Sequence, residues 1–151
     1  MSRKGDAPLI LASSSPRRRE LLGHFGVDFT VKVPAVDESL LPHEDPVAHV
    51  RRLALAKAAK VAAEAEAGLV IGADTVVVLD GEIIGKPEDR EDAVRMLSAL
   101  AGRTHRVYSG VAVTALPAGT TKSFVACSRV TMAPVAGPEI RRYVEGGEPL
   151  D

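Results

Sequence analysis

Short apolar runs alternate with amphipathic stretches along this chain, a pattern that predicts strands interleaved with helices. A short buried strand is expected at Leu9–Ala12, and a second strand is expected at Phe29–Val33. Two later apolar runs, LVIGADTVVVL and EIIG, are joined at Asp80-Gly81, a dipeptide typical of type I′ hairpin turns. The alternating runs RVYSGVAVTAL and SFVACSRVTM flank PAGTTK and predict a second hairpin.

The first helix is expected directly after the first strand. Ser15 is a good N-cap, and Pro16 suits the first helical position. Gly26 is expected to end this helix, and its predicted apolar face consists of Leu21, Leu22 and Phe25.

Three further helices follow from periodicity and from capping residues. Asp45-Pro46 opens a longer helix that runs to about Ala65, and Lys57 lies on the apolar stripe of that helix. The others are expected at Glu88–Leu100, with Gly102 as its stop, and near Pro138–Val144, ahead of GGEPLD.

Helices between strands, combined with hairpins, predict an α/β fold with a mixed twisted sheet flanked by helices. The chain has 151 residues, 46% of them hydrophobic, which is ordinary for one globular domain. A net charge of −1 argues against a broad nucleic-acid-binding surface, and no apolar run is long enough to span a membrane. The single Cys127 is expected as a small core residue and fits a reducing, cytoplasmic location.

Arg17, Arg18 and Arg19 stand in the first turn of a helix, where positive charge opposes the helix dipole. Free backbone N–H groups and guanidinium groups at that place are suited to a phosphate. The alternative is a solvated helix face. The glycine patterns of P-loops, of dinucleotide sites and of serine hydrolases are absent.

Acids and lysines in other segments could complete such a site. Asp74 interrupts an apolar strand and needs a partner, a metal or a cleft edge if it is not simply a turn residue. Glu38, next to Asp37, is either a divalent-cation ligand or a solvated loop acid. Lys57 is either a snorkelling side chain or functional, and Lys86 lies in a loop that could face phosphate. The four histidines show no metal-ligand spacing, and no catalytic role is assigned to them.

The ordered series LASSSPRRRELL, VDES, LALAKA, GADTVVVLDGEIIGKP and LSALAGRTHRVYSGVAV resembles the signature motifs of the Maf family. This resemblance implies a two-lobed fold with a central cleft, related to inosine triphosphate pyrophosphatases. It also implies cleavage of a nucleoside triphosphate between the α and β phosphates, with a divalent metal (Mg²⁺ or Mn²⁺). A homodimer is plausible from the family.

Carried over residue by residue, the resemblance gives Asp74 the role of general base that activates water, shared with a metal role. Glu38 matches the family's metal-associated acid. The residues that match its phosphate-binding positions are Ser13, Arg17, Arg18, Lys57 and Lys86. Arg17 and Thr75 occupy the positions that discriminate substrates, and they match the branch acting on dTTP and UTP.

Family members continue beyond the EPLD-like motif, so residues 1–151 are expected to be a single Maf-like domain that lacks its C-terminal segment. The main hypothesis is a house-cleaning pyrophosphatase for dTTP, UTP or modified pyrimidine nucleotides. The alternative is a non-catalytic nucleotide-binding regulator of septation, since the family is also linked to septum inhibition.

Overall fold

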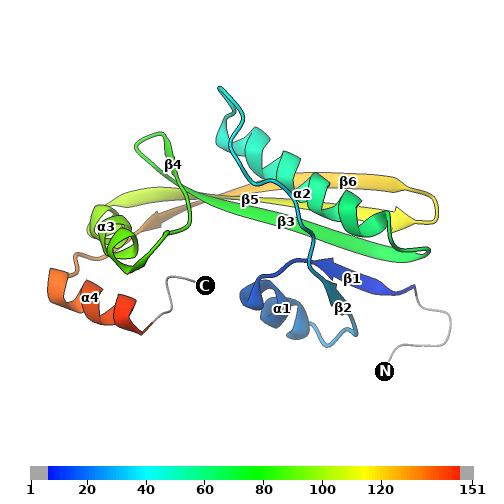
Figure 1. Cartoon of the computed structure of the whole chain (residues 1–151), viewed down its shortest axis with the longest axis horizontal. Coiled ribbons are helices and arrows are strands. Elements are labelled where there is room, and N and C mark those ends of the chain that lie inside the picture. Colours follow the sequence, from blue (N-terminus) through cyan, green and yellow to red (C-terminus); the bar gives the residue numbers. More distant parts are fainter. Residues whose placement is uncertain (1–6, 147–151) are drawn as a thin grey trace. The chain divides into compact units, whose positions relative to one another are not determined.

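The computed structural model describes residues 7–146, which form a six-stranded mixed sheet with helices (Figure 1). Along the sheet the strand order is β2-β1-β3-β5-β6, and β4 pairs with β3. The strands are β1 Leu9–Ala12, β2 Thr30–Lys32, β3 Gly68–Leu79, β4 Glu82–Ile84, β5 Thr104–Leu116 and β6 Thr120–Thr131. The helices are α1 Pro16–Gly23, α2 Pro46–Ala62, α3 Arg90–Leu100 and α4 Gly137–Glu145. The predicted α/β class with a mixed sheet is confirmed.

Residues 7–75 and 109–126 form one compact unit, and residues 76–108 and 127–146 form a second. In the first unit, β1 lies between β2 and β3 and is parallel to both, with Ile10 opposite Thr30 on one side and Val70 on the other. The core of this unit is small and aliphatic. Its buried residues are Ile10, Ala12, Ala54, Ala58, Val61, Val70 and Ala112.

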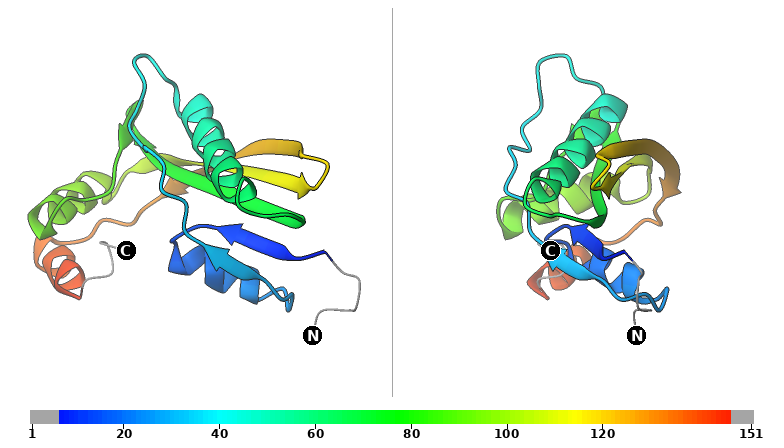
Figure 2. Two further views of the ribbon diagram at one scale, coloured as in Figure 1. Left: turned by 45° about the vertical axis from the view of Figure 1, so that its right-hand side comes forward. Right: turned by 90° about the vertical axis from the view of Figure 1, so that its right-hand side faces the viewer.

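Helix α2 lies close against the strands β3 and β5 (Figure 2). Two strand glycines make this approach possible. A Cβ at Gly72 would stand 2.3 Å from the carbonyl oxygen of Ala54, and one at Gly110 would stand 2.4 Å from that of Val50. The buried face of α2 includes the stripe predicted from the sequence, and Lys57 lies on it.

The second unit has a core of its own. The chain turns from β3 into β4 at Asp80 and Gly81, whose φ angles of 53° and 81° are those of the predicted type I′ turn. Helices α3 and α4 lie side by side, and Ala93 of α3 packs with Ile140 and Val144 of α4 (Figure 1).

Some sequence-based expectations are wrong in detail. Helix α1 ends at Gly23 rather than at Gly26, and Gly26 adopts a φ of 68° in the turn that follows. Phe25 therefore lies outside the helix and is 77% exposed, and Leu21 is 62% exposed, so this short helix has no buried apolar face. Cys127 lies in β6 as expected, but it is exposed rather than part of the core.

Within the described residues, no helix is both long enough and apolar enough to cross a membrane. The GGEPLD motif, apart from Gly146, lies outside the described residues.

Candidate active site

The turn from β1 into α1 is held by serine hydroxyl groups. Ser13 is buried, and its backbone N–H donates to the carbonyl oxygen of Lys32 at 3.1 Å. Its hydroxyl accepts from the backbone N–H of Ser15 at 3.0 Å. The hydroxyl of Ser15 caps α1 by accepting from the backbone N–H of Arg18 at 3.3 Å, as the sequence predicts.

Of the three consecutive arginines, Arg18 forms side-chain hydrogen bonds within the first unit. Its Nη1 donates to the Ser13 hydroxyl at 3.4 Å, and its Nη2 donates to the Thr75 hydroxyl at 3.2 Å. Thr75 in turn shares a hydrogen bond of 3.1 Å with the hydroxyl of Ser109. Arg17 and Arg19 are exposed. A simple solvated helix face therefore describes Arg17 and Arg19 but not Arg18.

Arg18 is a partly desolvated cation. Burial lowers the pKa of its guanidinium below the usual value, and the nearby carboxylates of Asp74 and Glu38 oppose that shift. The guanidinium stays charged, because an arginine side chain in a protein is not deprotonated. A cation that has lost part of its water shell is suited to bind an anionic group.

Asp74 lies inside β3 and is 7% exposed, so it is not a turn residue. It lies on the same strand face as Val70 and Gly72, beneath α2, because side chains alternate along a strand. Gly72 pairs with Ala12, the last residue of β1, and Asp74 therefore lies just beyond the carboxyl end of that strand. Carboxyl ends of parallel strands are the usual place for functional groups in α/β sheets.

Lys57 links the two predicted acids. Its Nζ lies 3.1 Å from Oδ1 of Asp74 and 2.6 Å from Oε1 of Glu38. The ammonium group is buried and does not reach into solvent as a snorkelling side chain would. Two carboxylates and one lysine thus meet in the first unit, and both carboxylates are near enough to Arg18 to act on its charge.

His49, Glu44 and Arg52 extend this cluster and were not identified from the sequence. His49 is buried, with Nδ1 2.7 Å from Oε1 of Glu44 and Nε2 4.0 Å from Oδ2 of Asp74. Arg52 binds Glu44 through Nε at 2.6 Å and through Nη2 at 2.9 Å. These hydrogen bonds from Arg52 lower the pKa of Glu44 to about 2. A signal was available, because His49 and Lys57 are eight residues apart and lie on one helix face.

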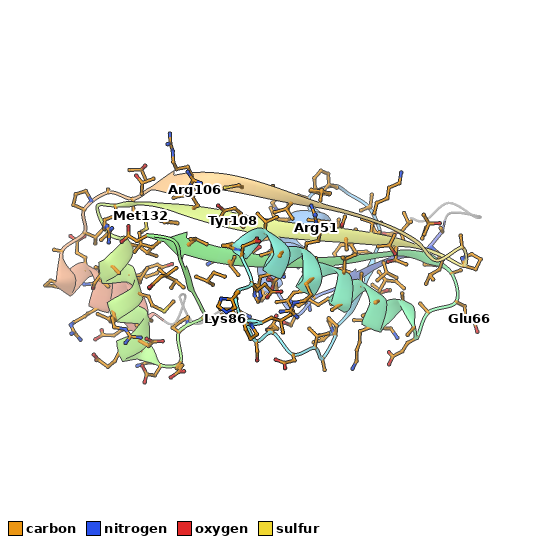
Figure 3. The ribbon with its side chains drawn as sticks, turned by 90° about the horizontal axis from the view of Figure 1, so that it is seen from above. Arg51, Glu66, Lys86, Arg106, Tyr108 and Met132 are labelled. Carbon is orange, nitrogen blue, oxygen red and sulfur yellow. The ribbon has the colours of Figure 1, made fainter. Side chains whose placement is uncertain are left out.

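Lys86 belongs to the second unit, in the loop after β4 (Figure 3). It is exposed and lines a surface pocket of about 390 Å³ together with residues from β4 and α3, among them Ile84, Asp92 and Met96. Its role at a phosphate remains a prediction.

The donor set favours a hard cation only in part. Among the described residues, no group of three or more His, Cys, Asp or Glu side chains is arranged to hold a metal ion. Glu38 and Asp74 supply two carboxylates, and Oδ2 of Asp74 is buried without a hydrogen-bond partner among the described atoms. Two carboxylates fit Mg²⁺, which usually takes its remaining ligands from water and substrate phosphates.

Comparison with known proteins gives close sequence relatives. The chain is 50% identical over 143 residues to the dTTP/UTP pyrophosphatase of Moorella thermoacetica, covering 95% of this chain and 74% of the relative. It is 51% identical over 144 residues to the dTTP/UTP pyrophosphatase of Dictyoglomus turgidum, covering 95% of this chain and 75% of the relative.

The fold is also similar to that of a solved structure. The Ham1 protein of Staphylococcus aureus matches with a TM-score of 0.56 at 18% identity, over 83% of this chain and 72% of that protein, which supports the fold alone. The family model described as Maf-like protein matches residues 8–151. With that match and relatives at about 50% identity, the chain belongs to the Maf family.

Proposed function

We propose that this chain is a nucleoside triphosphate pyrophosphatase that hydrolyses dTTP and UTP to the nucleoside monophosphate and pyrophosphate. Relatives at about 50% identity bear that name. The observation that carries the proposal for this chain is the buried contact of Lys57 with Asp74 and Glu38. Phosphoryl transfer requires cations that stabilise the charge of the phosphates and an acid that positions or activates the attacking water, and this site brings both together from separate segments.

Asp74 is the proposed general base. It takes a proton from a water molecule whose oxygen attacks the α phosphorus, and pyrophosphate leaves with the electrons of the broken bond. Lys57 forms an ion pair of 3.1 Å with its Oδ1, which leaves Oδ2 as the oxygen without a hydrogen-bond partner among the described atoms. In this proposal Arg17, Arg18 and Lys57 offset the charge of the phosphates, and the neutral hydroxyl of Ser13 donates a hydrogen bond to a phosphate oxygen. Lys86, in the second unit, is proposed as a further phosphate-binding residue.

Glu38 and Asp74 are the residues that would hold a divalent cation, Mg²⁺ or Mn²⁺. Such an ion, when bound, polarises the phosphoryl oxygens and offsets negative charge at the phosphates. Support for this part is the oxygen donor set and the buried, unpartnered Oδ2 of Asp74 within the described structure. The identity of the metal stays a prediction.

Thr75 and Arg17 are the proposed specificity residues. The contact of Arg18 with Thr75 supports a place for Thr75 beside the phosphate-binding turn. Arg17 occupies the substrate-discriminating position of the family motif, but its side chain is exposed. The contact of Arg18 with the Ser13 hydroxyl makes Arg18 the better supported of the two arginines for binding phosphate.

A non-catalytic regulator of septation is the less favoured alternative, because the acids and cations matched to the catalytic positions are all retained. Homodimer formation and a cytoplasmic location remain predictions.

The experiment that tests the proposal is pyrophosphate release from dTTP, UTP, CTP, GTP and 7-methyl-GTP, with Mg²⁺ or Mn²⁺. Metal-dependent release from dTTP and UTP is expected, and it should be lost in Asp74→Asn. Folded protein that releases no pyrophosphate from any of these nucleotides would contradict the proposed function.

A further inference from the structure

Ser109 of β5 has no role in the proposed function, yet its hydroxyl lies beside that of Thr75 in β3. The two strands are neighbours in the sheet, and the two hydroxyl oxygens are 3.1 Å apart. Both side chains point away from α2, because side chains alternate along a strand and the adjacent residues Asp74 and Gly110 face that helix. Thr75 is exposed, so a ligand can reach it, whereas Ser109 is half-buried.

The hydroxyl of Thr75 lies between a cation and a second hydroxyl. Its oxygen has two acceptor positions, and Nη2 of Arg18 occupies one of them at 3.2 Å. If Ser109 donates the hydrogen bond that the two hydroxyls share, both acceptor positions of Thr75 are filled and the Thr75 hydrogen is left for another group. If Thr75 donates instead, the Ser109 hydrogen is left. In either arrangement the pair offers one hydrogen-bond donor.

The Ser13 hydroxyl, which also contacts Arg18, follows the same rule. Its oxygen accepts from the backbone N–H of Ser15 at 3.0 Å and from Nη1 of Arg18 at 3.4 Å, which fills both acceptor positions. The hydroxyl hydrogens of Ser13 and of the Thr75–Ser109 pair are therefore donors beside one guanidinium, which has no acceptor of its own. Donors grouped around a cation fit the oxygens of an anion, such as those of a phosphate.

We propose that Ser109 is a positioning residue that donates to the Thr75 oxygen and so directs the Thr75 hydroxyl hydrogen toward the phosphate group that Arg18 binds. This inference rests on the proposed function, in which Arg18 contacts a phosphate of the nucleotide. Donation from Ser109 leaves the hydrogen on the exposed member of the pair, where a phosphate oxygen can accept it. Without Ser109 the Thr75 hydroxyl is free to rotate, and it is no longer held as a donor.

Calorimetric binding of inorganic pyrophosphate in the presence of Mg²⁺ tests this contact without turnover. We expect Ser109→Ala to weaken binding about threefold to tenfold, the range for one hydrogen bond, and Ser109→Thr, which keeps the hydroxyl, to bind within about twofold of wild type. Thr121→Val is the matched control, because it removes a hydroxyl that bonds that of Thr114, also in β5, at 2.8 Å. This control should leave pyrophosphate affinity unchanged. Thermal unfolding of each variant shows that the affinities refer to folded protein.

A double-mutant cycle shows whether Ser109 acts through Thr75. Thr75→Val removes the hydroxyl and keeps the shape, so adding Ser109→Ala to it should weaken binding by less than about twofold more. Unchanged affinity in Ser109→Ala, a folded Ser109→Thr that binds as weakly as Ser109→Ala, or losses that multiply in the double variant would each overturn the inference. Wild-type protein that binds pyrophosphate but hydrolyses no nucleotide would instead overturn the proposed function, and the cycle would still decide the role of Ser109.

Discussion

Lys57 of α2 and Asp74 of β3 form a buried ion pair, with Nζ 3.1 Å from Oδ1. The two side chains are each about 10% exposed, so each charge depends on the other for solvation that water no longer supplies. Glu38 joins the pair from a loop and is about half exposed. The ion pair therefore lies in the interior of the first unit, whereas the Glu38 side chain beside it is partly open to solvent.

Replacing Asp74 by Asn tests its assignment as the general base. The amide cannot accept the proton of water, so turnover of dTTP is expected to disappear. Nucleotide binding should stay within about tenfold of wild type, or ~1.4 kcal/mol, because the shape of the side chain is retained. Pyrophosphate release and calorimetric binding measure the two effects. Turnover at the wild-type rate would show that Asp74 is not the base.

Replacing Lys57 by Met removes the cation and leaves two carboxylates facing each other. Breaking one side of a buried pair is expected to lower the free energy of unfolding by about 3 kcal/mol. Lys60→Met, on the exposed side of the same helix, is the matched control and should change it by less than about 0.5 kcal/mol. Urea denaturation measures both. Equal stabilities for the two variants would mean that Lys57 adds nothing to the fold.

Much of the fold can be predicted from local patterns, because local chemistry decides it. The Asp80-Gly81 turn needs two residues that tolerate positive φ, and both adopt it. The N-caps Ser15 and Asp45 act as predicted, since each supplies a side-chain oxygen to an otherwise unpaired N–H group. The prediction that Leu21 lies on a buried face of α1 is wrong for a non-local reason. Burial of this side chain depends on which elements pack against the helix, and the periodicity of the sequence does not specify them.

The candidate site was less predictable from the residues alone. Arg18 meets Thr75 across 57 positions of the chain, and nothing in the local pattern distinguishes Arg18 from Arg17 or Arg19. The spacing of apolar residues along α2 predicts that Lys57 lies on the buried face. Its contact with Asp74 depends on the packing of β3 beneath that helix, which the local sequence does not specify. The histidines show no metal-ligand spacing, so the sequence gives no signal of that kind for His49, whose neighbours in the structure are the carboxylates of Glu44 and Asp74.

Replacing Arg18 by Gln tests the phosphate-binding turn. The guanidinium is partly desolvated and contacts Ser13 and Thr75, so its loss should weaken triphosphate binding by about 1.5–3 kcal/mol, the range for hydrogen bonds to charged groups. Monophosphate binding should weaken less. Arg19→Gln, exposed in the same helical turn, should leave both affinities near wild type. Equal losses for triphosphate and monophosphate would place Arg18 away from the β and γ phosphates.

Replacing Gly72 by Ala tests the close approach of α2 to the sheet. The new Cβ would stand 2.3 Å from the carbonyl oxygen of Ala54 and 2.7 Å from the backbone nitrogen of Ala58, and backbone atoms cannot swing aside as a flexible side chain can. A loss of about 1–3 kcal/mol in unfolding free energy is expected. At Gly23 of α1 the space around a Cβ is empty, so Gly23→Ala should leave stability unchanged or slightly raised. A Gly72→Ala protein as stable as wild type would contradict the observed packing distance.

Replacing Glu44 by Gln tests the ion pair behind His49 through acid denaturation. Because Arg52 holds the pKa of Glu44 near 2 in the folded protein, against a usual value of 4.5, the unfolded chain binds the proton more tightly. The stabilisation is therefore complete above about pH 4.5 and is lost as the pH falls toward 2.

The Glu44→Gln variant has no carboxylate to protonate at this position, so its unfolding free energy should depend less steeply on pH across this window. The groups that face Glu44 are the guanidinium of Arg52, which is always charged, and the ring of His49. Urea denaturation at pH 2.5, 3.5, 4.5 and 6 measures the slope, and Glu20→Gln at an exposed position of α1 serves as the control. Identical slopes for wild type and Glu44→Gln would mean that the contact between Arg52 and Glu44 does not persist in solution.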